Sequence, residues 1–186
     1  MIYLRWLVLS LTDWLLLLTV PVAAPIIAAI YRAQPYGLAP YSWGWIWGTY
    51  DNPPQGDEGF VRKRAPFPGY TSGWRGYLNR CMWMVRNPLY GFARKAAVNY
   101  SPTLFVTCKG REDISDKYKR PGWYFARAVD LAGRTVAFEL YCVLPWGFGR
   151  CLRARLGWKI MTDKFGRYGF AQLVNTCNPF DGYGED

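Results

Sequence analysis

The sequence predicts an α+β fold with a membrane helix at its N-terminus, and three patterns indicate it. Residues 6–31 are almost entirely apolar, residues 71–87 repeat apolar side chains at helical spacing, and the chain after Asn99 alternates as strands do. We therefore expect four parts in order. They are a hydrophobic anchor (1–35), an aromatic interfacial segment with a Pro/Gly-rich loop (36–70), a basic α+β domain (71–180) and an acidic tail (181–186).

The anchor is defined by its lack of charge. Between Arg5 and Arg32 the only charged residue is Asp13, and the run exceeds the ~20 residues that cross a hydrocarbon core. The alternatives are a cleaved signal peptide, a buried core helix and an interfacial helix. Pro25 would follow the cut after Val22–Ala24, and an interfacial helix should show a charged face, which this run lacks. Spanning or deep insertion is the interpretation that we retain.

Two prolines interrupt the anchor. Pro21 and Pro25 each remove a backbone donor, which predicts a kink or break near residue 20. Asp13, in the first piece, would cost about 2.5–3.5 kcal/mol in lipid unless it is protonated or paired. It is interpreted either as a helix-pairing site or as a carboxylate at headgroup level.

Tyrosine and tryptophan are concentrated after the anchor, where amphipathic rings favour the membrane boundary. Trp43, Trp45 and Trp47 are spaced by two, so a short core strand is the alternative. The lysines and arginines beyond residue 31 favour a cytoplasmic C-terminal part. The residues that we assign to the membrane interface are Tyr31, Tyr36, Trp43, Trp45 and Trp47.

The formal net charge is +10, which draws the protein toward anionic lipid, nucleic acid or an acidic protein. Beside a membrane anchor, lipid is the simplest partner. The chain has no histidine, which excludes the commonest general base and the Ser-His and Cys-His nucleophile pairs. Its five cysteines form no C-x-x-C pair, so we expect no zinc site, no disulfide framework and no cofactor.

Carboxylate chemistry is still open to a chain without histidine. Asp51, Asp57 and Glu58 lie in a loop rich in proline and glycine. Such oxygen ligands can hold Mg²⁺ or Ca²⁺, although the spacing matches no known calcium loop. The alternative is a polar turn in which Asn52 and Asp57 cap backbone groups.

An amphipathic basic helix is predicted from Thr71 to about Arg86, ending before Pro88. It either lies on headgroups with its arginines at phosphate level or packs on a sheet with a solvated cationic face. Its apolar side chains are Trp74, Tyr77, Leu78, Cys81, Met82 and Val85. The basic residues assigned to an anionic partner here are Arg80, Arg86, Arg94 and Lys95.

After Asn99 an antiparallel meander is predicted. The last full strand places Leu152, Ala154, Leu156 and Trp158 on one face and Arg153 and Arg155 on the other. We expect the arginine face to be the outer one, available to an anionic partner; nucleic-acid binding by this face is an alternative. The expected strands are 104–109, 123–129, 135–144, 151–160 and 170–176.

Three stretches stand out by their residue pattern: Asp51-Asn52 with Gly56-Asp57, Trp83-Met-Val-Arg-Asn-Pro-Leu-Tyr-Gly-Phe92, and Gly157-Trp158-Lys159 with Asn178-Pro179-Phe180. The second stretch, with its R-N-P-x-Y-G-F pattern, is the specific one. In these stretches the chain resembles a family of small tailed-bacteriophage proteins of uncharacterised function that begin with a hydrophobic segment. The resemblance implies a phage origin and brings no catalytic residue.

These patterns, with the phage origin that the resemblance implies, predict a membrane-anchored protein that acts through binding or assembly, and an enzyme is the less favoured interpretation. We expect it either in the virion, engaging the host envelope, or in the host inner membrane. Its partners would be membrane lipid or an envelope protein, with self-association open. The alternatives are an enzyme acting on envelope lipid or glycan through the acidic loop, and a nucleic-acid-binding protein.

Overall fold

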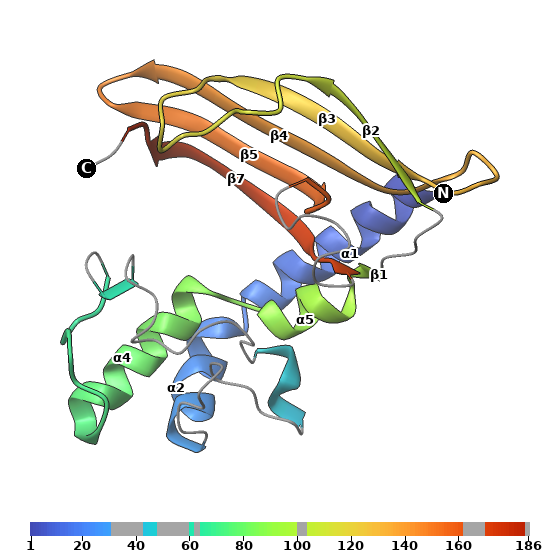
Figure 1. The fold of residues 1–186 in the computed structure, drawn as a ribbon. Coiled ribbons are helices and arrows are strands. Elements are labelled where there is room, and N and C mark those ends of the chain that lie inside the picture. The colour runs from blue at the N-terminus through green and yellow to red at the C-terminus, as the bar shows by residue number, and fades with distance from the viewer. Residues whose placement is uncertain (31–42, 48–59, 62–63, 100–103, 162–169, 185–186) are drawn as a thin grey trace. The chain divides into compact units, whose positions relative to one another are not determined.

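The computed structural model describes residues 1–30, 43–47, 60–61, 64–99, 104–161 and 170–184 (Figure 1). The chain is mixed α+β, as predicted. It divides into two compact units, a sheet unit formed by Met1–Val8 and Ala96–Asp186 and a helical unit formed by Leu9–Lys95.

The N-terminal apolar run forms two helices, α1 (Ile2–Leu17) and α2 (Val20–Ile30), which bend by 70° at the break between them. This is the break that the prolines predict. Pro21 lies in the first turn of α2, where a missing N–H costs nothing, while Pro25 lies inside the helix. At the break the Thr19 hydroxyl donates to the Leu16 carbonyl at 2.6 Å.

The helical unit continues with three further elements, the 3-10 helix η1 (Trp43–Ile46), α4 (Gly73–Arg86) and α5 (Tyr90–Lys95). The tryptophans at 43 and 45 therefore belong to a 3-10 turn, and the alternative of a short strand is wrong. The core of this unit lies between α2 and α4 and includes Phe60 and Leu89. Its buried members are Val20, Ala24, Ile27, Ala28, Phe60, Trp83, Met84 and Leu89.

Helix α4 ends as predicted, at Arg86, one residue before the Asn87-Pro88 pair. The Asn87 backbone N–H and side chain both donate to the Trp83 carbonyl, at 2.9 and 3.3 Å. Leu89 follows with a φ of 56° and is buried. Gly91, in α5, packs so closely on the backbone of Trp45 that a Cβ would overlap its carbonyl.

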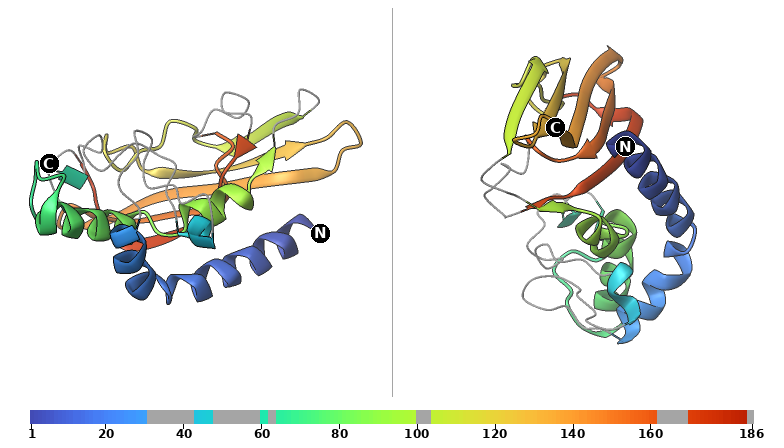
Figure 2. Two further views of the ribbon diagram at one scale, coloured as in Figure 1. Left: turned by 90° about the horizontal axis from the view of Figure 1, so that it is seen from below. Right: turned by 90° about the vertical axis from the view of Figure 1, so that its right-hand side faces the viewer.

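The sheet unit is built on a five-stranded antiparallel sheet in the order β2-β3-β4-β5-β7, so the predicted meander is confirmed. The strands twist across the sheet (Figure 2). Strand β4 runs through Pro145, which was expected in a turn, and a register shift accommodates it. The strands are β2 (Phe105–Gly110), β3 (Gly122–Val129), β4 (Thr135–Gly147), β5 (Arg150–Trp158) and β7 (Leu173–Gly182), with a small separate pair, β1 (Val98–Asn99) and β6 (Phe170–Ala171).

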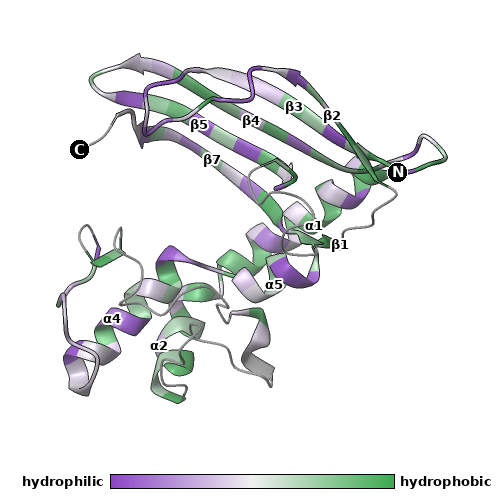
Figure 3. Cartoon of the chain, in the orientation of Figure 1, coloured by the Kyte–Doolittle hydropathy of each residue, from purple (hydrophilic) through white to green (hydrophobic). Residues whose placement is uncertain are grey.

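The register assigns the strand residues to two faces, and hydrophilic and hydrophobic residues alternate along the strands (Figure 3). One face, which we call the covered face, includes Tyr124, Glu139, Tyr141 and Arg155 and is buried at its centre. The other, the open face, is apolar. Its residues include Trp123, Phe125, Leu140, Leu144, Leu152 and Leu156.

Helix α1 covers one end of the open face. The rings of Tyr3 and Trp6 lie 4.9 and 5.7 Å from the ring of Phe138, and the Arg5 guanidinium lies 5.7 Å from the ring of Trp158. Trp158 is fully buried, and its indole N–H donates to the Ala96 carbonyl at 3.0 Å. The start of α1 therefore belongs to the sheet unit as a packed element.

Candidate membrane-binding surface

Exposed apolar side chains follow one another along α1 and α2 at three- and four-residue spacing. We call this surface the α1–α2 outer face. In α2 the opposite side, with Ala24, Ile27 and Ala28, is buried in the core, so the helix is apolar on every side. A helix that is apolar all round is typical of a protein interior or a membrane. The outer face comprises Leu11, Leu15, Leu18, Val22, Ile26 and Ile30.

Among the described residues, no single helix combines the length and apolarity needed to cross a bilayer. Taken together, α1 and α2 meet that test by length and composition, with the 70° bend between them. The apolar run is thus a bent pair of helices, with the break near residue 20 that the two prolines predict.

Helix α4 carries a second exposed apolar stripe, formed by Trp74, Leu78, Met82 and Val85. The side that it buries is different and includes Gly76, Asn79 and Trp83. The predicted apolar stripe is therefore largely the outer side of this helix, and a mixed set of residues makes the inner side.

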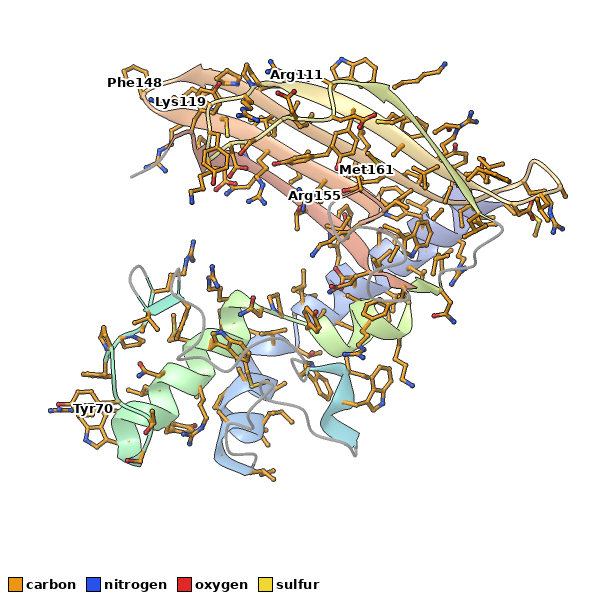
Figure 4. The ribbon with its side chains drawn as sticks, viewed as in Figure 1. Tyr70, Arg111, Lys119, Phe148, Arg155 and Met161 are labelled. Carbon is orange, nitrogen blue, oxygen red and sulfur yellow. The ribbon has the colours of Figure 1, made fainter. Side chains whose placement is uncertain are left out.

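An arginine lies among aromatic rings at the start of α4. The Arg75 guanidinium is 4.6, 5.4 and 5.6 Å from the rings of Tyr70, Trp74 and Phe67. Tyr70 lies beside the first turn of α4 (Figure 4), and the rings of Phe67 and Trp74 meet edge to face. The backbone of this loop is held by the buried Asn79 side chain, which bonds to Phe67 N and O at 3.0 and 2.6 Å.

Of the aromatic residues predicted at the membrane interface, Trp45 and Trp47 are half-buried. The Trp47 indole N–H donates to the Thr19 hydroxyl at 2.8 Å, which ties η1 to the bend between α1 and α2. Trp43 begins η1, and its side chain lies outside the described part of the structure. Tyr31 and Tyr36 also lie outside the described residues, so their assignment stays a prediction.

The basic residues predicted on α4 and α5 have different surroundings. Arg80 is half-buried, and its guanidinium donates to the carbonyls of Ala28 and Thr71, both at 3.2 Å. It thus satisfies a carbonyl in the last turn of α2, where a cation is favourable. Arg86, Arg94 and Lys95 lie in the last turns of their helices and are exposed.

Arg153 and Arg155 point to the covered face, so the expectation of a basic outer face is wrong for these two residues. The Arg155 side chain is only 15% exposed and lies 3.7 Å from Glu139 and 4.1 Å from the centre of the Tyr141 ring. Arg153 pairs with Asp181 at 3.0 Å and with Asp116 at 3.7 Å.

Glu139, which is fully buried, is the centre of this polar network. Its carboxyl accepts hydrogen bonds from the Tyr124 hydroxyl at 2.9 Å and from the Met161 N–H at 2.8 Å. Figure 4 labels Arg155 and Met161 near this point of the sheet. Burial and the Glu139 carboxylate raise the pKa of Tyr124, which remains a donor at neutral pH. With the contacts of Arg153 to Asp181 and Asp116, the network connects β3, β4, β5, β7 and the β2–β3 connector.

Asp51, Asp57 and Glu58 lie outside the described residues, so their candidate metal or acid–base role stays a prediction. Within the residues that the structure describes, no group of three or more His, Cys, Asp or Glu side chains is placed to hold a metal ion.

Sequence reasoning missed two features. It treated Asp116 as part of a charged connector, whereas the Asp116 carboxylate accepts from the Tyr141 hydroxyl at 3.0 Å. It also missed the exposed aromatic tip of the β4–β5 hairpin, where Phe148 is 96% exposed (Figure 4). The glycines that flank Phe148 signalled a tight turn, but periodicity alone does not tell which side chain a turn projects.

Comparison with known proteins matches the chain to a protein family. The model of a family of unknown function, DUF7338, matches residues 1–185. No curated protein matches the chain, and no solved structure does.

Proposed function

The chain belongs to this family of unknown function, and we propose that it is a membrane-anchored binding protein whose α1–α2 pair inserts into a lipid bilayer. The observation that carries the proposal is the α1–α2 outer face. Its six side chains would otherwise be solvated, and exposed apolar patches of this extent mark interaction or membrane sites.

Other features of the helical unit suit a bilayer boundary. The Arg75 guanidinium and the rings of Phe67, Tyr70 and Trp74 form a partly exposed cluster of the kind that settles at headgroup level, where rings are half in lipid and the cation meets phosphate. The α4 stripe starting at Trp74 would extend the contact. A formal net charge of +10 adds attraction to an anionic surface.

We propose the host inner membrane, or the host envelope met by a virion, as the location, because the chain resembles tailed-bacteriophage proteins. The enzyme alternative gains no support from the described residues. The nucleic-acid alternative loses its two main arginines, because Arg153 and Arg155 are engaged with Asp181 and Glu139.

The test is flotation of the full chain with lipid vesicles, comparing Leu15→Asp with Leu131→Asp. Both leucines are exposed, 68% and 72%, but Leu131 lies in the β3–β4 turn of the sheet unit and is not one of the outer-face residues. An aspartate in a membrane helix costs about 3 kcal/mol, and about 1.4 kcal/mol is tenfold, so Leu15→Asp should weaken flotation about a hundredfold. Leu131→Asp should float as the wild type does.

A wild-type protein that stays out of the vesicle fraction would refute membrane insertion. If it then sedimented as a discrete oligomer that Leu15→Asp dissociates, the outer face would be an assembly contact.

A further inference from the structure

The open face of the sheet is a second apolar surface, separate from the α1–α2 outer face. Trp123, Leu144 and Trp146 are about half exposed, and Phe180 is more so. The rings of Trp146 and Phe180 meet edge to face at 5.8 Å, and the Trp146 indole N–H donates to the Pro179 carbonyl at 2.7 Å. The Trp146 and Phe180 rings therefore support each other while half or more of each residue stays exposed.

Charge is distributed unequally between the two faces of this sheet. The strand carboxylates, Glu139 and Asp181, belong to the covered face, where Arg155 and Arg153 pair with them. On the open face the register places Lys109 opposite Phe125 and Arg127 opposite Phe138. Among the described strand residues of the open face there is no carboxylate.

The open face also contacts the start of α1, within the sheet unit. The first turns of α1 lie on it through Tyr3 and Trp6, which contact Phe138. A sheet whose apolar face is joined to an inserting helix would meet the lipid surface along that face.

We propose that the open face rests on an anionic phospholipid surface, with its rings at the acyl boundary and Lys109 and Arg127 at phosphate level. The inference rests on the proposed function, because α1 would bring this face to the bilayer. Phe148, at the hairpin tip and flanked by Gly147 and Gly149, would be the outermost ring of the contact. Its φ of 51° is a left-handed conformation that holds the turn in a defined shape.

A native thiol reports on this surface. Cys177 is exposed and, through Ala154, belongs to the open face, whereas Cys108 belongs to the covered face. The experiment labels the full chain with a water-soluble maleimide in vesicles of phosphatidylethanolamine and phosphatidylglycerol. Mass spectrometry of the separate peptides then gives the labelling rate at each cysteine.

The matched variants are Leu144→Glu on the open face and Val106→Glu on the covered face, at residues that are 46% and 42% exposed. We expect slow labelling of Cys177 in the wild type and in Val106→Glu, and labelling several-fold faster in Leu144→Glu. All three should float with the vesicles, because α1 and α2 are unchanged.

The two proposals fail in different ways. Loss of flotation in the wild type would refute the anchor. Flotation with equally fast Cys177 labelling in the wild type and in Leu144→Glu would overturn the lipid contact of the open face and leave the anchor standing. Hydrogen exchange in the same vesicles measures whether β4 and β5 stay folded in both variants. If they do, unfolding is excluded as the cause of faster labelling.

Discussion

At the scale of single residues, the Glu139 carboxyl is the buried group of the sheet unit that most needs hydrogen-bond and ion-pair partners. It is fully buried, and a buried charge is tolerated only when it is paired and hydrogen-bonded. Tyr124, Arg155 and the Met161 N–H supply these partners from two strands and the residues after β5. The network therefore favours this arrangement of the strands over any other in which the Glu139 carboxyl would be separated from Tyr124, Arg155 and the Met161 N–H.

Removal of one hydroxyl tests this role. Tyr124→Phe takes a donor from Glu139 without changing the shape of the ring, and hydrogen bonds to charged groups contribute about 1.5–3 kcal/mol. We expect the free energy of unfolding, measured by urea denaturation in detergent, to fall by that amount. Tyr118→Phe, at an exposed ring in the β2–β3 connector, is the control and should change it by less than about 0.5 kcal/mol. Equal effects of the two variants would contradict the assignment.

The same tyrosine should make the free energy of unfolding decrease at alkaline pH. Burial, then the charge of Glu139, raises the pKa of Tyr124, and burial with Asp116 raises that of Tyr141. In the unfolded chain these phenols lose their protons near pH 10, while in the folded protein they keep them. The stabilisation is complete below about pH 10 and is lost as the pH rises through the folded pKa. Urea midpoints measured across this window should fall more steeply for the wild type than for Tyr124→Phe.

Gly91 packs against the backbone of Trp45, and only a residue without a Cβ fits there. Alanine normally stabilises a helix relative to glycine by about 0.5–1 kcal/mol, but a Cβ at position 91 would overlap the Trp45 carbonyl. We expect Gly91→Ala to destabilise the protein by about 1–3 kcal/mol, the usual cost of overpacking. Gly182→Ala, whose Cβ would meet open space, should be close to neutral in the same thermal unfolding measurement.

At the scale of elements, the sequence predicts the strands, their meander order and the end of α4 well, because these depend on local signals. The alternation over Gly122–Val129 and the proline after Asn87 are examples. The R-N-P-x-Y-G-F stretch also has a structural explanation, since Asn87 caps α4 and Gly91 allows the approach of η1.

Local signals do not tell which side of an amphipathic element is covered. In α4 the stripe through Leu78 is the more apolar one, yet the helix turns Asn79 and Trp83 inward. In β5 the leucine face is open and the arginine face is covered. The reason is the same in both elements. Asn79 bonds to Phe67 and Tyr70 in the preceding loop, and Arg155 lies beside Glu139 and Tyr141 on the neighbouring strand. Apolar spacing within one element does not reveal such contacts with another segment.

The outer stripe of α4 makes a prediction of its own. Leu78→Asp places a charge on an exposed side chain, so the urea stability in detergent should change by less than about 0.5 kcal/mol. If the stripe contacts lipid, the same variant should bind vesicles more weakly than Leu131→Asp. Unchanged binding would restrict the lipid contact of the helical unit to α1 and α2.

At the scale of the whole molecule, the two contributions to the proposed membrane binding have different physical origins. The formal net charge of +10 attracts anionic headgroups over a distance set by the Debye length, about 10 Å at 0.1 M salt and about 3 Å at 1 M. Burial of the α1–α2 outer face is a hydrophobic contribution that salt does not screen. Salt and a single substitution can therefore separate them.

We expect the wild type to stay with phosphatidylglycerol-containing vesicles at both low and high salt, because the inserted helices hold it there. Leu15→Asp, with the insertion weakened, should bind at low salt through its cationic surface and be released near 1 M salt, where those charges are screened. Flotation across a salt series measures both curves, and Leu131→Asp serves as the control that follows the wild type. If the wild type itself were released at high salt, electrostatic attraction alone would account for its binding, and the α1–α2 pair would be a peripheral element and not an anchor.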